Sequence, residues 1–404
     1  MRFFAALLLA LAGLSSQAHA EDAVGRGRYL AILGDCGGCH TREHGAPFAG
    51  GLAFRSQFGT VYSTNITPDR TTGIGAWTAD QFYRALHDGI AADGHHLYPA
   101  FPYVYFRRIS RRESDDLFAF LHSLKPVRQA PTPNKLIFPL NIRAGLIFWN
   151  WLYLPKASPR IDPAASPAWK RGEYLVNGLG HCGACHTPKD ILFGDKSSEA
   201  LTGALLDNWY AANLTGNMHA GLGKWTSQDL TRFLATGRSR FATAAGNMQE
   251  KVSQSTSHFS DADRAAIATY LKSLPADRSR TPTPPKSEQM KEGEALFVSR
   301  CQGCHQAPGQ PNPFRTQSLP DYPWLGGDTL ILGRDPTTVL RIILQGAQSP
   351  ATPNEKLSYS MPAFATLSDD QIAAVATYIR NSWGNQAGPV SSFAVKTLRA
   401  KLRG

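Results

Sequence analysis

Apolar residues recur at helical spacing in three parts of the chain, and each part opens and closes in the same way. The opening segments each begin at a glycine and read Gly27-Arg-Tyr-Leu30, Gly172-Glu-Tyr-Leu175 and Gly293-Glu-Ala-Leu296. The closing segments also have a helical pattern and cover residues 113–124, 260–274 and 368–383. Ser260 is followed three residues later by Asp263, and Ser368 by Gln371, as at the N-terminal caps of helices. The pattern predicts a mainly α protein made of three tandem repeats, each of helices and loops.

Internal landmarks and proline-rich stretches set the bounds of the repeats. Asn65-Ile-Thr67 corresponds to Asn213-Leu-Thr215, and each is followed by a Gly-x-Gly-x-Trp run that ends at Trp77 or Trp225. Proline-rich stretches between the repeats predict extended, semi-rigid connections. The predicted parts are a leader at 1–20, a first repeat at 21–127, a Pro-rich and apolar connector at 128–165, a second repeat at 166–275, a Pro-rich linker at 276–286, a third repeat at 287–385 and a basic amphipathic tail at 386–404.

The first twenty residues have the pattern of an export signal. Arg2 precedes an apolar run at 3–14, and small residues at Ala18 and Ala20 predict cleavage after Ala20. The run is short for a membrane span, so an uncleaved anchor is the weaker alternative. We therefore expect a periplasmic protein.

A second apolar segment, residues 136–154, has a different character. Pro139 interrupts it, and Asn141, Arg143 and Asn150 would each be costly in hydrocarbon. We interpret the segment as an exposed or interdomain surface that could dock on another protein or dip into lipid.

The chain has a net positive charge, but this charge does not indicate a nucleic-acid partner. The formal net charge is +11, and removal of the leader with Arg2 leaves +10. An exported chain without a basic motif interleaved with aromatic residues does not fit a nucleic-acid partner.

All six cysteines fall into three copies of one motif, Cys-x-x-Cys-His. The copies are Cys36-Gly-Gly-Cys39-His40, Cys182-Gly-Ala-Cys185-His186 and Cys301-Gln-Gly-Cys304-His305. This motif is the attachment signature of c-type haem: two thiols bond to one porphyrin, and the histidine ligates its iron. A structural zinc would need four protein ligands, yet the nearest two copies begin 119 residues apart. Disulfides or redox-active dithiols would not explain a histidine after every pair. We predict three covalently bound haems.

Methionines at similar positions predict the sixth iron ligands of the second and third repeats. Met248 lies 62 residues after His186, and Met361 lies 56 residues after His305. Thioether ligation of this kind raises the reduction potential of a haem. Packing in the core is the alternative role of a methionine. Met218 and Met290 lie outside this position of the repeat.

The first repeat lacks a methionine, and Phe101 stands 61 residues after His40. His87, His95 and His96 are the candidate replacements for the sixth ligand. His44 is too near the attachment motif, and His122 lies too far into the closing helix. We expect the first haem to differ from the others, either with two histidine ligands and a lowered potential or with five-coordinate iron.

Four repeated side chains could contact haem. The amide groups of Asn65 and Asn213 and the indole groups of Trp77 and Trp225 could donate hydrogen bonds to haem propionates. They could equally be turn and core residues. Both interpretations stay open at this point.

These residues resemble the three-haem cytochrome c subunits of membrane-associated periplasmic dehydrogenases that oxidise alcohols, gluconate, sugars or aldehydes. The matching motifs cover nearly the whole mature chain and include Thr64-Asn-Ile-Thr-Pro68, Thr72-Gly-Ile-Gly75, His96-Leu-Tyr-Pro-Ala100, Phe138-Pro-Leu-Asn-Ile-Arg143, Trp149-Asn150, Ser260-Asp-Ala-Asp263 and Tyr270-Leu-Lys-Ser-Leu274. The resemblance implies three tandem cytochrome c-like domains, each built around one haem, with Met248 and Met361 as axial ligands. Phe101 departs from members that have methionine there.

The resemblance also implies a role and partners. A separate catalytic subunit with pyrroloquinoline quinone, flavin or molybdenum cofactor would oxidise the substrate, and the cytochrome would pass the electrons to ubiquinone or another respiratory acceptor. Such subunits are held at the membrane surface, commonly through the C-terminal region. Here the tail from Val390 to Gly404 mixes apolar and basic residues without an acid, as in a helix lying on an anionic membrane, or in a disordered basic tail.

We therefore expect an electron-transfer subunit that does not act alone on an organic substrate. Two alternatives remain: a freestanding periplasmic multihaem carrier, and a first haem that is an open centre for ligand binding or peroxide reduction.

Overall fold

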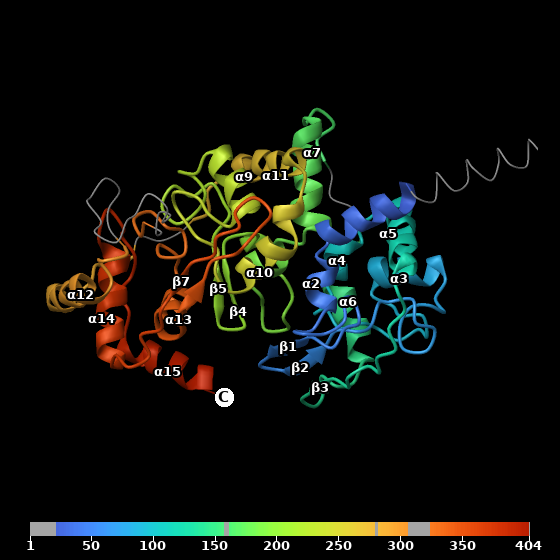
Figure 1. Cartoon of the computed structure of the whole chain (residues 1–404), viewed down its shortest axis with the longest axis horizontal. Helices are drawn as coiled ribbons and strands as arrows, with labels where there is room; N and C mark the ends of the chain where they lie inside the picture. Colours follow the sequence, from blue (N-terminus) through green and yellow to red (C-terminus); the bar gives the residue numbers. More distant parts are fainter. Residues whose placement is uncertain (1–21, 157–160, 279–281, 306–323, 404) are drawn as a thin grey trace, which may run out of the picture. The chain divides into compact units, whose positions relative to one another are not determined.

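The computed structural model describes residues 22–156, 161–278, 282–305 and 324–403, and their secondary structure is mainly helical, as predicted (Figure 1). The described residues belong to two compact units. Unit 1 comprises the chain up to Asp162 together with Tyr174–His181, and unit 2 comprises Pro163–Glu173 and the chain from Cys182 onward. The predicted leader at 1–20 lies outside the described residues.

Unit 1 contains the first repeat and the predicted connector. Its helices are 22–33, α2 (Cys36–His40), α3 (Ala79–Asp88), α4 (Tyr103–Phe106), α5 (Arg111–Ser123) and α6 (Gly145–Tyr153). Its strands β1 (Ala53–Ser56), β2 (Gly59–Tyr62) and β3 (Lys135–Leu136) form an antiparallel sheet in the order β1-β2-β3, with Ala53 opposite Tyr62 and Thr60 opposite Lys135. The connector therefore packs on the first repeat through β3. The hydroxyl of Tyr103 also donates to Asn150 Oδ1 of α6 over 2.6 Å.

Unit 2 contains the third repeat and most of the second repeat. The helices of the second repeat are α7 (Pro167–Tyr174), α8 (Gly183–His186), α9 (Ser227–Thr236), α10 (Asn247–Gln254) and α11 (Asp261–Ser273), with 3₁₀ turns at Ser197–Glu199 and Thr256–His258 and a hairpin of β4 (Ala204–Leu206) and β5 (Trp209–Ala211). The last residue of α7 and the π-turn that follows it at Leu175–Leu179 belong to unit 1. The third repeat has α12 (Ser287–Arg300), α13 (Thr337–Gln345), α14 (Asp369–Asn381), α15 (Ser392–Arg403) and paired strands β6 (Ala347–Gln348) and β7 (Ser360–Met361).

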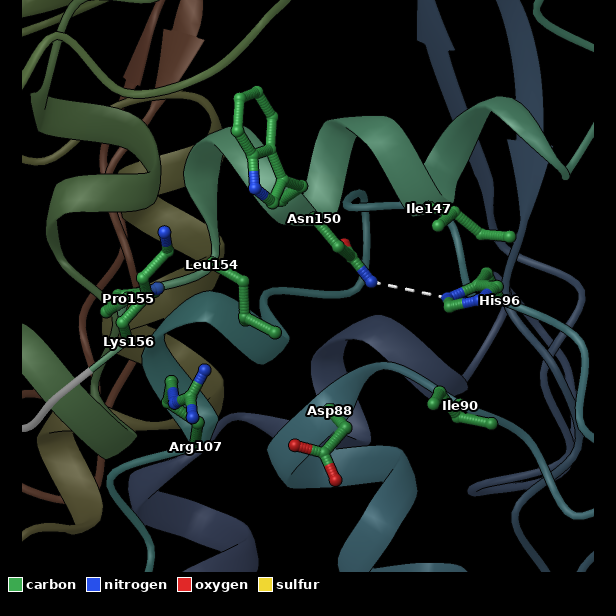
Figure 2. A pocket seen from close by; sticks show the side chains of 10 residues that line it. Asp88, Ile90, His96, Arg107, Ile147, Asn150, Leu154, Pro155 and Lys156 are labelled. Atoms are coloured by element: carbon green, nitrogen blue, oxygen red, sulfur yellow. Dashed lines mark hydrogen bonds between the residues drawn. The ribbon is translucent and has the colours of Figure 1, made fainter.

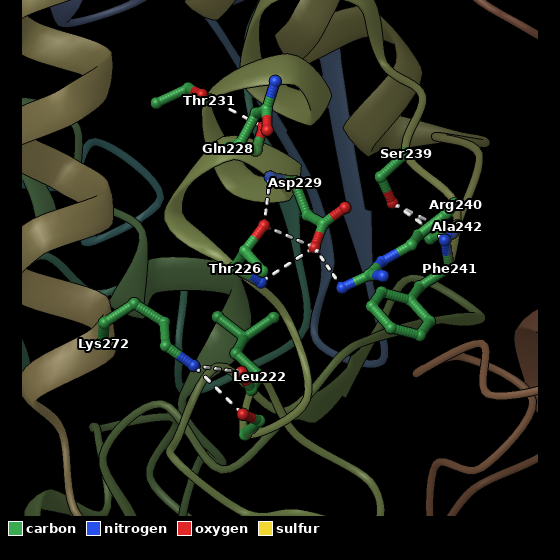
Figure 3. Close-up of polar contacts among 11 residues, drawn as sticks. Leu222, Thr226, Gln228, Asp229, Thr231, Ser239, Arg240, Phe241, Ala242 and Lys272 are labelled. Carbon is green, nitrogen blue, oxygen red and sulfur yellow. Dashed lines mark hydrogen bonds and ion pairs between the residues drawn. The ribbon is translucent and has the colours of Figure 1, made fainter.

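Side-chain caps start the helices at the predicted places. Ser368 and Gln371 form a reciprocal capping box at α14, and Ser260 accepts a hydrogen bond from the Asp263 N–H at α11. Both predicted caps are confirmed. Figure 3 shows the box that the sequence analysis did not single out, in which Thr226 and Asp229 begin α9.

The glycines of the three opening segments allow two helices to cross closely. A Cβ added at Gly27 would lie 1.9 Å from the Asp116 carbonyl oxygen of α5. Added at Gly172 it would lie 1.9 Å from the Ala266 carbonyl oxygen of α11. In the third repeat, Gly293 and the Ala374 carbonyl oxygen of α14 repeat this approach at 2.2 Å. Each repeat therefore pairs its opening helix with its closing helix at a contact that only glycine permits.

The C-terminal tail is helical and contributes to the core of the third repeat. Val395 and Leu398 of α15 are buried in a cluster with residues of α13 and α14. Arg399 pairs with Asp369 at 2.9 Å and donates to the Ala365 and Leu367 carbonyls. The apolar face that predicted a membrane helix is therefore covered by the protein itself, although Phe393 is 76% exposed. Within the part of the chain that the structure describes, no helix combines the length and apolar character that a membrane crossing requires.

Candidate haem-binding sites

The three Cys-x-x-Cys-His motifs each form a single helical turn. In the second motif the N–H groups of Cys185 and His186 donate to the Cys182 carbonyl over 3.2 and 3.0 Å. In the third, Cys304 and His305 donate to the Cys301 carbonyl over 3.1 and 3.0 Å. The first motif is the helix α2 itself. Because residues three and four apart share a helix face, the two sulfurs and the imidazole of each motif project to one side.

The histidines of the first two motifs are held in the orientation that iron ligation needs. His40 Nδ1 lies 2.6 Å from the Thr64 carbonyl oxygen, and His186 Nδ1 lies 2.7 Å from the Ala212 carbonyl oxygen. A carbonyl only accepts hydrogen bonds, so each Nδ1 carries the proton and Nε2 keeps its lone pair. Metal-ligating histidines commonly donate their other ring N–H in this way.

These carbonyl groups were not predicted from the sequence, although the sequence contains a signal for them. Thr64 and Ala212 directly precede the repeated Asn65 and Asn213. Backbone acceptors leave no mark of their own in a sequence, because every residue has one. The repeated asparagines were the available clue.

Burial favours the uncharged forms of the motif side chains. Removal from water lowers the pKa of His40 and of His186, which keeps the imidazoles neutral, although the Thr64 and Ala212 carbonyls oppose this. Burial raises the pKa of the Cys182 thiol and of the Cys301 thiol to about 11. These thiols are therefore protonated at neutral pH rather than reactive thiolates.

The geometry does not favour the two rival uses of the cysteines. No disulfide joins any of the six cysteines, all of which lie in the described part of the chain. Among the described residues, no three His, Cys, Asp or Glu side chains gather in a group that could hold a metal ion, as a structural zinc would require. The donor set instead fits haem, with thioether bonds from each cysteine pair and an iron bond from the adjoining histidine.

The repeated asparagines serve the turn before Thr67 and Thr215. Asn65 Oδ1 accepts from the Thr67 N–H over 2.9 Å, and its Nδ2 donates to the Val127 carbonyl over 2.7 Å. Asn213 Oδ1 likewise accepts from the Thr215 N–H over 2.8 Å. The turn interpretation therefore applies to the asparagines, whose side chains place the carbonyl groups beside His40 and His186.

Trp225 differs from the asparagines. Its ring is buried and packs against Phe233 and Phe241, each with centroids 5.6 Å away. Among the described residues its indole N–H has no acceptor. A buried donor without an acceptor is costly, so this N–H fits a hydrogen bond to a haem propionate.

Similar helix ends precede Phe101 in the first repeat and Met248 in the second. Gly89 and Gly237 end α3 and α9 with positive φ angles of 66° and 72°. The Leu97 N–H donates to the Gly89 carbonyl over 2.7 Å, and the Ala244 N–H donates to the Gly237 carbonyl over 2.7 Å. Phe101 is the fourth residue after Leu97, as Met248 is the fourth after Ala244. Phe101 thus follows the same kind of turn as Met248, although Met248 lies in α10 and Phe101 lies just before α4.

Met361 is reached by a different local structure. It lies in β7, opposite Ala347 of β6, and its partly buried side chain packs against the core of the third repeat. Met218, which the sequence analysis set aside, is 61% exposed. Met248 and Met361 therefore stay predicted ligands, although one lies in helix α10 and the other in strand β7.

The three candidate histidines of the first repeat each have a partner at Nδ1. His87 lies 2.8 Å from Asp88 Oδ1, and His95 lies 2.6 Å from Asp93 Oδ1. Figure 2 shows the third contact, in which His96 Nδ1 lies 3.3 Å from Asn150 Nδ2 beside a cavity of about 370 Å³. That cavity is lined by α6 and by residues that include Asp88 and Arg107.

The cysteine sites fit haem, and comparison with known proteins gives the class of the chain. The family described as Cytochrome c matches residues 170–275 and 290–383. The chain is therefore a c-type cytochrome.

Curated relatives match nearly the whole chain. It is 40% identical to the gluconate 2-dehydrogenase cytochrome c subunit of Pantoea cypripedii, over 97% of this chain and 94% of the relative. It is 39% identical to the cytochrome c subunit of the alcohol dehydrogenase (quinone) of Gluconobacter oxydans, over 95% and 84%. The fructose dehydrogenase cytochrome subunit of Gluconobacter japonicus is 38% identical, over 95% and 84%. The chain belongs to this family of dehydrogenase cytochrome c subunits.

Proposed function

We propose that this chain carries three covalently bound haems and passes electrons from a dehydrogenase catalytic subunit to ubiquinone or another respiratory acceptor. The main support is that His40 and His186 each lie next to a cysteine pair and form a hydrogen bond from Nδ1 to a backbone carbonyl group. Haem iron supplies one-electron chemistry, and the protein supplies ligands, spacing and electrostatics. The names of the relatives, which are subunits of gluconate, alcohol and fructose dehydrogenases, support a separate catalytic partner.

The connector offers a surface for assembly in the periplasm at the membrane face. Large apolar side chains are exposed along residues 137–152, among them Phe138 at 79% and Trp151 at 62%. Residues 117–161 contain no Asp or Glu, whereas Arg143 and Lys156 flank α6. Aromatic residues with basic neighbours suit the boundary of an anionic membrane. We place the peripheral membrane contact here, because the apolar face of α15 is already covered.

The test is purification of the haem-loaded chain from membranes of its own host, with any large oxidoreductase subunit that accompanies it. Gluconate, ethanol and fructose are then added in turn while haem absorbance is followed. We expect one of them to reduce the haems only when the large subunit is present, and a short-chain ubiquinone to reoxidise them. A haemochrome assay should give three haems per chain, and two after Cys301 and Cys304 are both replaced by alanine.

A chain that purifies alone from the soluble periplasm, with haems that no substrate of a co-purifying enzyme reduces, would instead favour a freestanding carrier. The alanine variant separates this outcome from a failure of haem attachment, because its haem count does not depend on a partner.

A further inference from the structure

The first repeat presents iron with a side chain that cannot ligate it. The hydrogen bonds from Leu97 to Gly89 and from Ala244 to Gly237 close similar turns, and Phe101 and Met248 each lie four residues after the donor. An isolated antiparallel bridge closes each turn, between Ile90 and His96 in the first repeat. The second repeat has the matching bridge between Arg238 and Thr243. The position of Phe101 is therefore set by backbone contacts and does not rest on sequence spacing alone.

The contacts of His96 leave its Nε2 atom protonated, so this atom cannot ligate iron. The hydroxyl of Tyr103 donates to Asn150 Oδ1 over 2.6 Å, a separation that suits an O–H···O hydrogen bond and favours this orientation of the amide. Asn150 Nδ2 then donates to His96 Nδ1 over 3.3 Å. A neutral imidazole that accepts at Nδ1 has its proton on Nε2, so Nε2 has no lone pair to offer iron.

His95 and His87 are held elsewhere. His95 lies in a tight turn in which the Ala91 N–H donates to the His95 carbonyl over 2.9 Å, and its ring pairs with the exposed Asp93. His87 stacks on Tyr83 with ring centroids 5.2 Å apart. Its ring thus shares the Tyr83 side of α3, whereas the buried residues of this helix are Phe82, Ala85 and Leu86.

The two remaining histidines of this part of unit 1 differ in exposure, and among the described residues the buried Nε2 atom of His122 has no hydrogen-bond partner. The side chain of His44 is 92% exposed beside Glu43. His122 forms a hydrogen bond with the Ile74 backbone near the end of α5, and its ring packs against Phe118 at 4.0 Å. The Nδ1 contacts of His87 and His95 leave Nε2 with its lone pair, so what counts against these two is where their rings lie, beside Tyr83 and beside the exposed Asp93.

We propose that the haem attached at Cys36, Cys39 and His40 keeps an open sixth position facing Phe101 and binds small neutral diatomic gases, of which carbon monoxide is the probe. The proposal rests on haem attachment as proposed above. Phe101 lies against Phe106 and Tyr103, with ring centroids 5.4 and 6.4 Å apart, so its surroundings are aromatic. An apolar distal wall suits an uncharged ligand, because polarity and access on this side decide what iron binds. Binding is reversible addition to ferrous iron and needs no further reactant.

The experiment titrates the reduced, haem-loaded full chain with carbon monoxide after its haem count has been measured. We expect one high-spin haem in three, and one bound carbon monoxide per three haems. Phe101→Met should abolish this binding and turn the high-spin haem into a low-spin one. Phe148→Met is the matched control: it places the same change on exposed α6, where Phe148 is 59% exposed, and should leave binding unchanged.

Three low-spin haems that bind no carbon monoxide in the unsubstituted chain would overturn the proposal. So would carbon monoxide binding that Phe101→Met leaves intact, because the open haem would then lie elsewhere. If Phe101→Met is poorly folded, Phe101→His provides another possible ligand at the same position. It should likewise abolish carbon monoxide binding and turn the high-spin haem into a low-spin one. A count of two haems, with the Cys36 and Cys39 thiols reactive, would instead contradict three-haem attachment.

Discussion

The first and second repeats share one backbone plan, yet they differ at the side chains that would determine haem chemistry. In both, a carbonyl before a buried asparagine accepts from the motif histidine, and a glycine ends the middle helix with the same return hydrogen bond. At the ligand position one repeat has Phe101 and the other has Met248. The scaffold is set by backbone contacts that many sequences can make, so the ligand can change without disturbing it.

The two repeats also differ at one position of the closing helix, where a shared backbone contact is made by different side chains. In the second repeat Lys272 donates to the Leu222 and Gly223 carbonyls over 2.9 and 3.1 Å, as Figure 3 shows. The first repeat has His122 at this place, and the Ile74 backbone is its partner. Both repeats therefore have a hydrogen bond between this side chain and the backbone, but the side chain is a lysine in one repeat and a histidine in the other.

The largest effect is expected when the second repeat is made like the first. Met248→Phe removes the proposed thioether ligand, so a second haem should become high-spin and the bound carbon monoxide should rise from one to two per chain. Optical and electron paramagnetic resonance spectra with gas titration measure both. Met218→Phe, at an exposed methionine, is the control. An unchanged number of low-spin haems in Met248→Phe would show that this residue is not a ligand.

The shared helix crossing should be equally sensitive in both repeats. Gly27→Ala and Gly172→Ala each force a methyl group to within 1.9 Å of a carbonyl oxygen, so the helices must separate. We expect each to lower the free energy of unfolding of its repeat by about 2–3 kcal/mol. Urea unfolding of the haem-loaded chain, followed by circular dichroism and haem absorbance, measures the loss.

A matched control for this prediction lies on the same helix. Gly25 has nothing within 4 Å of an added Cβ, so Gly25→Ala should leave stability unchanged or raise it by about 0.5–1 kcal/mol through helix propensity. Equal stability of Gly27→Ala and Gly25→Ala would show that the crossing is not tight.

The smallest expected effect concerns pH. Burial lowers the pKa of His122, so the folded first repeat resists a proton that the unfolded chain accepts. This stabilising contribution is present above the ordinary histidine pKa of about 6.5 and is lost as the pH falls through the lower folded pKa. His122→Lys copies the second repeat and should weaken the loss of stability between pH 7.5 and pH 5. Urea midpoints at both pH values measure it, with His44→Lys as the exposed control. Equal acid sensitivity in the two variants would contradict the assignment to His122.

The sequence by itself determined the repeating pattern and the chemistry of attachment. Six cysteines in three identical motifs leave few physical alternatives, since two thiols and an imidazole at this spacing must share one helix face. The caps at Ser260 and Ser368 could be predicted because capping depends on residues three apart in sequence. Phe101 could be recognised as a departure from methionine for the same reason, by its place in a local register.

The tertiary structure alone decided which groups meet across long stretches of chain. The contact between Asn150 and His96 spans 54 residues, and that between His186 and the Ala212 carbonyl spans 26. The tail has the amphipathic pattern of a membrane helix, yet Val395 and Leu398 are buried in the third repeat. An amphipathic pattern along the chain predicts that the apolar face will be buried, because its exposure to water is unfavourable. Which partner provides the cover depends on the packing of the whole fold.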